Sequence, residues 1–510
     1  MVVEGQNYRR PLNAKQTAEM ITRAREDPGK CIQYITTEGR MVTGLTQQNP
    51  TPPVFSTKLG LIKLDARQIP LPAVRFGQTF MGNTPKWNLK SVSKYSKVGA
   101  RVRWGVFALT TSMAKANEAF GNIKAMMNKR GLSSEDPKFA PKLGKMELSE
   151  LHVSLNNRLH GFRQEGYKLV FVLLPDQLPA DEYAYIKRIA DVGLGIHTVC
   201  VNCRKKQGDQ YWDNVLLKVN LKLGGVNQTI SHPKPLPISF KTTMVVGLDV
   251  THPLSASGSN EGTAVMSTAG MVASTDEFLG QWPATIATQT RDKEEVVFNI
   301  DTIRALLKPH LARWAKINNA YPQQILVYRD GVSEGQYKQV VDSEYKHIKA
   351  VCGELYNPAP RVTIVIAAKR HHMRFYREDA MPKFPNQHPV NRGNPHPGTV
   401  VDRGVTSQFL WEFYLQAHNA IEGTARPAHY VVVVDEIFAN IQSSQTGISN
   451  NLAEVLHDIT LGLSFNVGRS TTSTSICTPA YLADKVCDRA RCYGAATAVH
   501  QNLRDSMFYI

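Results

Sequence analysis

Three apolar segments that end in acidic residues constrain the fold of this 510-residue chain more than any other feature. They are TMVVGLDVTHP with Asp249, ILVYRDGVSEGQ with Asp330, and YVVVVDE with Asp435 and Glu436. Unbroken runs of Val, Ile and Leu are typical of strands that an α/β sheet buries on both faces. A carboxylate at the mouth of such a strand lies where α/β proteins hold metal ions. The pattern is that of a magnesium-dependent nuclease core, and also that of any α/β sheet with polar strand ends.

The charge of the chain favours a polyanionic partner. Sixty Lys and Arg residues against 43 Asp and Glu residues give a formal net charge of +17 and a pI near 9.4. An excess of this size points above all to nucleic acid. No run of ~18 apolar residues predicts a membrane span, and MVVEGQNYRRPL lacks the apolar core of a signal peptide. Seven scattered cysteines suit reduced thiols. We therefore expect an intracellular protein, cytoplasmic and with nuclear residence left open.

The order of the segments predicts two α/β domains after a connector. Residues 1–85 are expected to be mostly linker, with a helix at 14–24. Within 86–237, the buried strand YKLVFVLLP and a helix at 180–192 predict a small Rossmann-like domain that ends at the proline-rich HPKPLP. Within 238–510, an antiparallel strand group followed by strand–helix alternation is typical of an RNase H-like domain. The expected fold class is therefore α/β.

Asp249 and Asp330 are the natural centre of a site that cleaves phosphodiesters. Two-metal hydrolysis needs carboxylates that hold two Mg²⁺ ions ~3.5–4 Å apart, one activating water and the other stabilising the leaving oxygen. Magnesium prefers oxygen ligands, which Asp and Glu supply and Cys does not. Spacing along the chain alone selects Asp435 as the third acid.

Two pairs of residues in the small domain have helical i, i+4 spacing, Tyr183 with Lys187 and Lys218 with Lys222. A tyrosine ring can stack on a base, and converging lysines can hold a phosphate. Such a group would bind a terminal nucleotide. The same residues also fit an ordinary solvated helix face, which spacing alone favours.

Seven phrases follow one another in an order and at spacings that resemble the eukaryotic Argonaute family: VVGLDVTHP, LKVNLKLGGVN, VYRDGVSEGQ, KRHHMRF, PGTVVD, GTARPAHY and TPAYLAD. The resemblance covers nearly the whole chain. It implies the end of a PAZ domain and the second linker in 1–85, a MID domain in 86–237 and an RNase H-like PIWI domain in 238–510. The family's N domain and most of PAZ find no match, so the chain resembles a MID–PIWI half.

The resemblance implies a set of acids for RNA cleavage in the PIWI part. Its two aspartates fall on Asp249 and Asp330. The last acid falls on Asp484, three residues after the tyrosine of the PAY phrase, Tyr481. Asp484 thereby replaces Asp435, which becomes a structural strand end. These three aspartates would hold Mg²⁺ or Mn²⁺.

A glutamate from a mobile loop completes the implied set. Counted from the WPA phrase it falls on Glu294, with the adjacent Glu295 as the alternative. Asp488, one helical turn after the last implied acid, is a weaker rival for that place.

The resemblance also implies a pocket for the 5′ end of a guide RNA. Tyr183 would stack on the first base, and four cations would meet the 5′-phosphate: Lys187, Lys218, Lys222 and Arg489. One phrase departs from the family, because the glutamine of its TQC phrase is replaced by Val199 in His197-Thr198-Val199-Cys200. Val199 cannot donate a hydrogen bond. Either a neighbour compensates, or the pocket is weaker by roughly 1.5–3 kcal/mol.

The implied function is that of a small-RNA-guided protein of RNA interference. It would bind the 5′-phosphorylated end of a guide RNA and cut complementary target RNA by two-metal hydrolysis. The alternative is a scaffold that binds a guide without cutting and represses targets through partner proteins of a silencing complex. An unguided nuclease of the RNase H type does not account for Tyr183 and Lys187.

Overall fold

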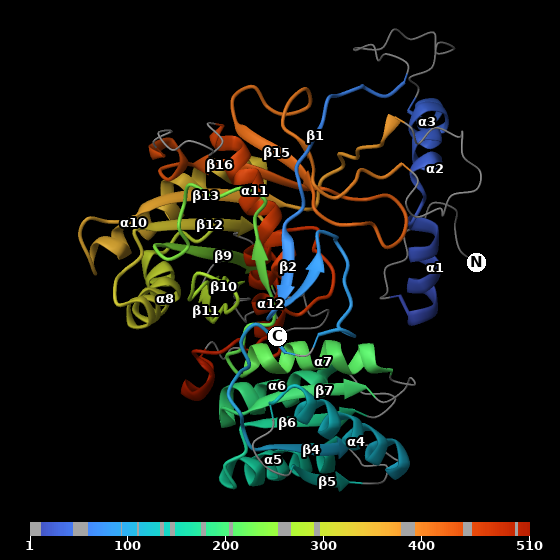
Figure 1. Ribbon diagram of the computed structural model, residues 1–510, viewed down its shortest axis with the longest axis vertical. Coiled ribbons are helices and arrows are strands. Elements are labelled where there is room, and N and C mark those ends of the chain that lie inside the picture. Colours follow the sequence, from blue (N-terminus) through green and yellow to red (C-terminus); the bar gives the residue numbers. More distant parts are fainter. Residues whose placement is uncertain are drawn as a thin grey trace, which may run out of the picture.

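The computed structural model describes most of the chain as two α/β units joined by a linker (Figure 1). The described residues are 12–43, 60–92, 94–109, 112–132, 137–142, 148–174, 180–202, 208–252, 267–289, 296–378, 393–441, 451–494 and 498–510.

The small unit is built on four parallel strands in the order β5-β4-β6-β7. The strands are β4 (Trp104–Leu109), β5 (Lys138–Lys142), β6 (Leu169–Leu174) and β7 (His197–Asn202). The helices of the unit are α4 (Met113–Lys129), α5 (Leu148–Gln164), α6 (Ala180–Arg188) and α7 (Asp209–Lys222). Strands and helices alternate along the chain, so each parallel connection crosses over through a helix. The expected Rossmann-like arrangement is confirmed.

The large unit contains a nine-stranded sheet in the order β1-β14-β15-β16-β13-β12-β9-β10-β11. Its strands are β1 (Arg67–Gln68), β9 (Thr243–Thr251), β10 (Ser267–Ala273), β11 (Ala284–Gln289), β12 (Gln324–Asp330), β13 (Arg361–Ala368), β14 (Thr399–Val401), β15 (Trp411–Gln416) and β16 (Ala428–Val434). Strands β11, β10 and β9 are antiparallel neighbours, and β9, β12 and β13 run parallel. The expected RNase H-like fold is confirmed.

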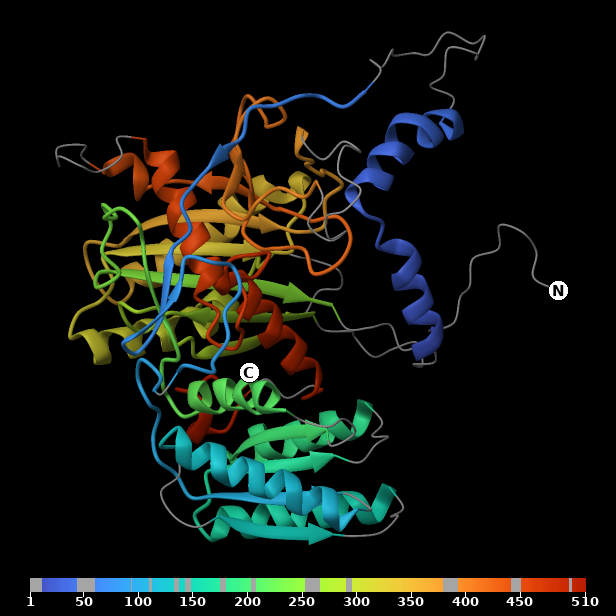
Figure 2. The same cartoon turned by 45° about the vertical axis from the view of Figure 1, so that its right-hand side comes forward.

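Both faces of this sheet are covered, which explains its unbroken apolar strands. Along β9, Val246 belongs to the core beneath α8 (Ile300–Asn318) and α10 (Lys346–Gly353). Its neighbour Val245 belongs to the core formed with α11 (Leu452–Phe465) and α12 (Thr478–Arg491). Successive residues of a strand point to opposite faces, so a strand buried on both sides has no polar alternation. Figure 2 shows α12, in red, extending from the sheet toward α7 of the small unit.

Strands of the linker pair with segments that lie far away in the chain. Strand β1 pairs with β14 at the edge of the large sheet. Strands β2 (Ala73–Phe76) and β3 (Thr79–Gly82) form a separate three-stranded sheet with β8 (Thr229–Ser231). The segment expected to be a connector therefore contributes strands to two sheets.

The predicted helix at 14–24 is confirmed as α1 (Ala14–Ala24). Asn13 Oδ1 accepts a hydrogen bond from the backbone N–H of Gln16, and Gln16 Oε1 accepts one from the backbone N–H of Asn13, which is a capping box at the start of the helix. Three short helical segments follow: α2 (Pro28–Gln33), the π-helical turn Tyr34–Glu38 and α3 (Gly39–Val42). Thr424 donates a hydrogen bond to the carbonyl of Glu26 at 3.0 Å, so this N-terminal segment contacts the loop before β16.

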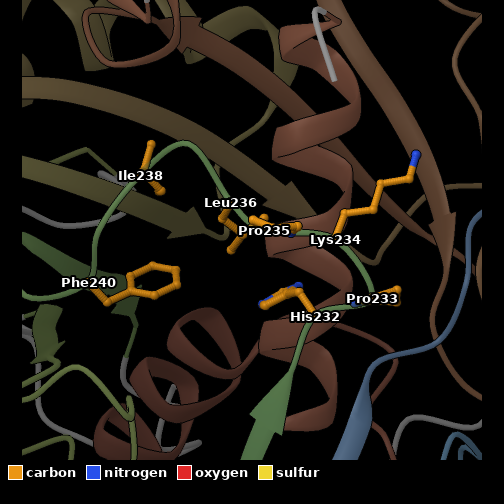
Figure 3. A pocket seen from close by; sticks show the side chains of 7 residues that line it. All are labelled: His232, Pro233, Lys234, Pro235, Leu236, Ile238 and Phe240. Atoms are coloured by element: carbon orange, nitrogen blue, oxygen red, sulfur yellow. The ribbon is translucent and has the colours of Figure 1, made fainter. Parts of the chain in front are cut away.

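The proline-rich joint between the units lies against α11. A Cβ at Gly462 of α11 would come within 2.3 Å of Cε1 of His232, so the close approach requires glycine there. Burial lowers the pKa of His232 to about 4, so its imidazole is neutral at pH 7. A pocket beside the joint is lined by His232, Pro233, Lys234, Pro235, Leu236, Ile238 and Phe240 (Figure 3). It contains none of the predicted catalytic or guide-binding residues.

Candidate functional site

The two central aspartates lie side by side at the carboxyl ends of β9 and β12. In the parallel pair, Arg329 is opposite Leu248, so the next residues, Asp330 and Asp249, are neighbours. Gly331 then turns the chain with a φ of 79°, and a Cβ there would lie 3.0 Å from Asp249 Oδ1. Glycine is therefore needed both for the turn and for the closeness of the carboxylate. The predicted pairing of Asp249 with Asp330 is present in the structure.

The environment of the two aspartates disfavours their negative charges. Burial, followed by the charges of Asp249 and Asp484, raises the pKa of Asp330 to about 7. Burial is also the main reason that the pKa of Asp249 is raised, with Arg329 opposing the shift. Backbone N–H groups of Val250 and Gly331 donate to the two carboxylates, each at 2.8 Å. Two crowded carboxylates of this kind suit a divalent cation, whose charge favours their ionised form and whose preferred ligands are oxygen atoms.

Asp484 reaches the same place from helix α12. The helix packs closely on the sheet, since a Cβ at Gly247 of β9 would lie only 2.0 Å from the carbonyl oxygen of Pro479. The charge of Asp484 acts on both central aspartates. Lys485 lies between two acids, with Nζ 3.1 Å from Asp484 Oδ2 and 2.6 Å from Asp488 Oδ2. Asp488 is thus held in ion pairs with Lys485 and Arg491.

The implied glutamate cannot be placed. Glu294 and its alternative Glu295 both lie outside the described residues. Within the described ranges, no group of three or more His, Cys, Asp and Glu side chains is close enough to hold a metal ion. The donor set that fits magnesium or manganese is therefore the pair Asp249 and Asp330, with Asp484 beside it.

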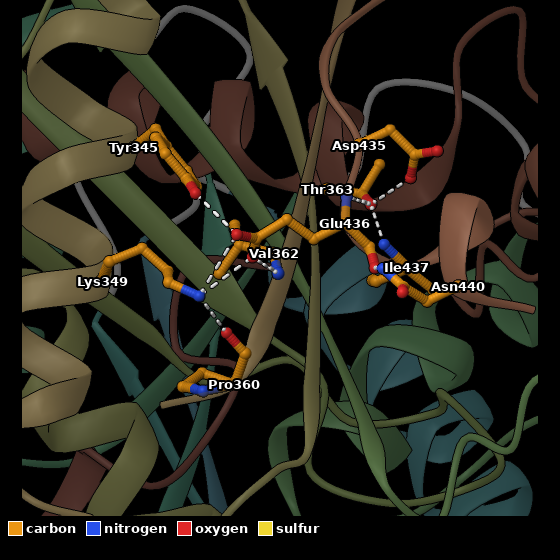
Figure 4. A network of polar contacts seen from close by, with 9 residues as sticks. All are labelled: Tyr345, Lys349, Pro360, Val362, Thr363, Asp435, Glu436, Ile437 and Asn440. Atoms are coloured by element: carbon orange, nitrogen blue, oxygen red, sulfur yellow. Dashed lines mark hydrogen bonds and ion pairs between the residues drawn. The ribbon is translucent and has the colours of Figure 1, made fainter. Parts of the chain in front are cut away.

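Asp435 lies at the opposite ends of the strands from Asp249 and Asp330. Strand β16 is antiparallel to β13, so its carboxyl end meets the beginning of β13, whereas Asp330 is level with Ala367 at the far end. Asp435 accepts a hydrogen bond from Thr363 Oγ1 at 2.8 Å (Figure 4). It also accepts one from the backbone of Phe438 at 2.9 Å. Spacing alone therefore selects the wrong acid, and the structural interpretation of Asp435 is confirmed.

Glu436 belongs to the same structural network. Its carboxylate accepts hydrogen bonds from Tyr345 at 2.6 Å, from the backbone of Val362 at 2.7 Å and from Lys349 at 3.0 Å (Figure 4). These bonds fasten the end of β16 to the start of β13 and to the helices that cover it.

The five residues predicted to bind the guide converge from three helices of both units: Tyr183 and Lys187 on α6, Lys218 and Lys222 on α7, and Arg489 on α12. Lys187 is buried and donates to the carbonyl and the hydroxyl of Thr198, both at 2.9 Å. Its Nζ lies 5.4 Å from the centre of the Tyr183 ring. The predicted grouping is present, so the interpretation as a solvated helix face is wrong for the lysines of α6 and α7.

The cations of this cluster disfavour one another. Burial, followed by the charges of Arg469, Lys187 and Arg489, lowers the pKa of Lys218 to about 8. Burial and the same kind of crowding lower the pKa of Lys222 well below its ordinary value. Burial and mutual repulsion disfavour the charged forms of these lysines. A bound phosphate would favour the charged forms, so the cluster is suited to an anion.

Two partners of these cations were not evident from the sequence. Asp191, which is fully buried, accepts from Arg489 Nη1 and from Tyr493 OH, each at 2.8 Å. The carbonyl of Phe508 accepts from Lys222 and, at 3.1 Å, from Arg489. In the sequence, Asp191 looks like part of an ordinary helix face, and a backbone carbonyl has no signature at all. Together they join the small unit to α12 and to the C-terminal residues.

Lys369 is a further cation that the sequence did not single out. It follows β13 within the KRHH phrase, and the charges of Asp330 and Asp484 act on it. Burial lowers its pKa despite those two carboxylates. An ammonium group whose charge acts on these acids can neutralise part of their charge or contact a phosphate that approaches them.

Comparisons with known proteins agree with this arrangement. The Piwi domain family model matches residues 169–494. Protein argonaute 5 of Arabidopsis thaliana is 31% identical over 96% of this chain and 49% of its own length. The protein argonaute of Schizosaccharomyces pombe is 28% identical over 96% of this chain and 57% of its own length. The chain thus spans about half the length of the curated relatives that it matches.

Two solved structures share the fold. The structure of Kluyveromyces polysporus Argonaute with a guide RNA matches with a TM-score of 0.80 and 25% sequence identity. The match covers 100% of this chain and 63% of the Kluyveromyces chain. The C-terminal lobe of a budding yeast Argonaute covers 87% of this chain and 95% of its own, with a TM-score of 0.70 and 26% identity. Among the helices that the structure describes, none is long and apolar enough to span a membrane.

Proposed function

Because this chain belongs to the Argonaute family and carries its Piwi domain, we propose that it is a small-RNA-guided endoribonuclease. In this proposal the cluster of cations between α6, α7 and α12 binds the 5′-phosphate of a guide RNA. The acids at the ends of β9 and β12 cut the RNA strand that pairs with the guide. We also propose 1–85, 86–237 and 238–510 as the limits of the linker, the MID domain and the PIWI domain.

One observation carries the proposal: helix α12 belongs to both sites. Asp484, beside the central acids, and Arg489, in the anion cluster, are five residues apart on it, which is roughly 7.5 Å along a helix axis. The helix is fixed on the sheet at Gly247 and on the small unit by the ion pair between Arg489 and Asp191. A guide held at its 5′ end would therefore run past the acids from a fixed origin, and the cut would fall at a fixed distance from that end.

The residues would divide the work as follows. Sequence would be read by base pairing with the guide, while Lys and Arg side chains hold the RNA backbone. Asp249 and Asp330, with Asp484 beside them, would hold Mg²⁺ or Mn²⁺, which supplies an activated water and stabilises the leaving oxygen. Tyr183 would stack on the first base of the guide, above the lysine that its ring already faces.

The test of this function is a cleavage assay with the purified chain. The chain is loaded with a synthetic guide, with or without a 5′-phosphate, and given complementary labelled RNA and Mg²⁺. We expect a single cut at a constant distance from the 5′ end of the guide, and a weaker or absent cut with the 5′-hydroxyl guide. Cutting at scattered positions, or equally well without a guide, would contradict the proposal.

A second function, a scaffold that holds a guide without cutting, is favoured by one observation. Lys485 bonds to Asp484 and thereby competes with a cation for the third acid. In this case the chain would retain phosphate-dependent guide binding and would produce no cut at any Mg²⁺ concentration.

Guide binding should depend on pH through Lys218. Its pKa in the guide-free protein is about 8, so it is charged below that pH and attracts the phosphate. Above pH 8, binding must first restore the proton. We therefore expect the affinity for a 5′-phosphorylated guide to fall by up to about tenfold per pH unit between pH 8 and 10. Fluorescence anisotropy of a labelled guide measures this.

Two variants separate the effect of Lys218 from a general loss of positive charge. Lys218→Met should bind more weakly at pH 7 and lose the part of the pH dependence that Lys218 causes, while the part that Lys222 causes remains. Lys316→Met, which removes an exposed lysine of α8, should keep the profile of the wild type. An unchanged pH profile in Lys218→Met would assign the dependence to another group.

A further inference from the structure

His197 is a buried polar residue at the anion cluster that the proposed function leaves without a role. It is the first residue of β7 and is 7% exposed. Its Nδ1 is buried, and the part of the chain that the structure describes offers it no hydrogen-bond partner. Buried nitrogen atoms are almost always paired, so one without a partner calls for an explanation.

The surroundings of His197 are those of the phosphate site. The charges that act on it belong to Lys222, Asp191, Lys187 and Arg489, which come from α7, the π-helical turn Ile189–Leu194, α6 and α12. Burial, followed by Lys222, lowers the pKa of His197 to about 3. The imidazole is thus neutral in the guide-free protein, with one N–H donor and one acceptor nitrogen.

Val199 lies two residues further along the same strand. Residues i and i+2 of a strand point to the same face, so His197 and Val199 share the side of β7 that faces α7. Val199 is buried in the apolar core and has no polar atom in its side chain. The hydrogen-bond donor that the Argonaute resemblance implies at this position is therefore missing, and the polar residue of β7 on that face is His197.

We propose that His197 is a ligand of the guide's 5′-phosphate in this protein and takes the place of the amide that is absent at Val199. The statement rests on the proposed function, because it assigns a specificity-determining residue to the same pocket. A ring N–H would donate to a phosphate oxygen, and the neighbouring cations would keep that oxygen negative. The buried nitrogen would thereby gain the partner that it lacks in the guide-free protein.

The test compares the affinities of 5′-phosphate and 5′-hydroxyl guides, since their ratio isolates the contribution of the phosphate from that of the RNA chain. For the wild type we expect a clear preference for the phosphate. In His197→Ala the preference should fall by roughly 10- to 100-fold, the effect of one hydrogen bond to a charged group. In His197→Ala/Val199→Gln the introduced amide should restore most of it. His160→Ala, at an exposed histidine of α5, should leave the ratio unchanged.

The outcomes separate this inference from the proposed function. A wild type without phosphate preference would overturn both. A wild type with preference, and a His197→Ala variant that keeps it, would overturn the role of His197 alone and leave the pocket in place. If His197→Ala does not fold, the wild type labelled with ¹³C at histidine Cε1 decides the matter by NMR. The His197 signal should shift with the phosphorylated guide and not with the hydroxyl guide, and an equal response to both would overturn the role.

Discussion

Asp330→Asn will abolish target cleavage and leave guide binding intact. Asparagine has the shape of aspartate and can still accept the hydrogen bond from Gly331, so the turn after β12 should persist. It lacks the negative charge that a divalent cation requires in this position. We expect the rate of cutting to fall at least roughly 1000-fold, which corresponds to about 4 kcal/mol of transition-state stabilisation. Single-turnover cleavage with saturating guide measures it.

Asp435→Asn is the matched control for this variant. Asp435 also ends an apolar strand of the same sheet, but it lies at the other ends of the strands and accepts hydrogen bonds from Thr363 and nearby backbone groups. The control should cut at a rate close to that of the wild type, with at most a modest loss of stability. If Asp330→Asn retained a rate within tenfold of the wild type, the assignment of the active site would be wrong.

Among the variants described here, Glu344→Gln will cause the largest decrease in the free energy of unfolding. Glu344 and Arg329 form an ion pair in the core of the large unit, where Arg329 Nε donates to both carboxylate oxygens at 3.0 and 3.1 Å. Glu344 also accepts from the backbone of Val297 at 2.9 Å. Glutamine keeps the size of the side chain but removes the charge that faces the buried guanidinium. Removing one partner of a buried pair costs about 3–5 kcal/mol, which the midpoint of urea unfolding at pH 7 will report.

Glu354→Gln provides the comparison at a more exposed ion pair. Glu354 pairs with Arg304 at 2.7 Å, and about a third of each side chain is exposed to solvent. An exposed pair contributes about 0–1 kcal/mol, so this variant should unfold near the midpoint of the wild type. Equal midpoints for the two variants would contradict the argument, because burial would then have no effect on the strength of the pair.

Glu344→Gln should also affect the active site, since Arg329 immediately precedes Asp330. The charge of Arg329 opposes the increase in the pKa of Asp249 that burial causes. A guanidinium that has lost Glu344 is attracted more strongly to Asp249 and Asp330 and would compete there with a divalent cation. We therefore expect weaker dependence of stability on added Mg²⁺ in this variant than in the wild type.

Much of the fold could be predicted because local pattern and position agree. The apolar runs before Asp249 and Asp330 are central parallel strands, and parallel neighbours bring their carboxyl ends to one edge. The i, i+4 pairs on α6 and α7 lie on helices, as their spacing required. In these cases the periodicity of one segment was sufficient, since a strand or a helix places its side chains without reference to the rest of the chain.

The candidate site was less predictable wherever strand direction or a distant partner mattered. YVVVVDE has the same pattern as the two strands that end in Asp249 and Asp330, yet β16 runs the other way. Asp191, in the π-helical turn after α6, and the carbonyl of Phe508, near the C-terminus, are partners of Arg489 only because the fold brings α12 to both. In the sequence, His197 is one residue of an otherwise mostly apolar strand. Its place at the anion cluster follows only from the four charged side chains that act on it.

The sequence by itself determined the α/β class, the two central aspartates and the identity of the residues that form the anion cluster. These follow from composition, from the periods of helix and strand, and from phrases that resemble one family. Only the tertiary structure decided how α12 brings Asp484 beside the central pair, at which end of the strands Asp435 lies, and which buried groups face the cations. The physical reason is that strand direction and helix packing are set by burial against distant segments, and such contacts leave no periodic mark on the segments themselves.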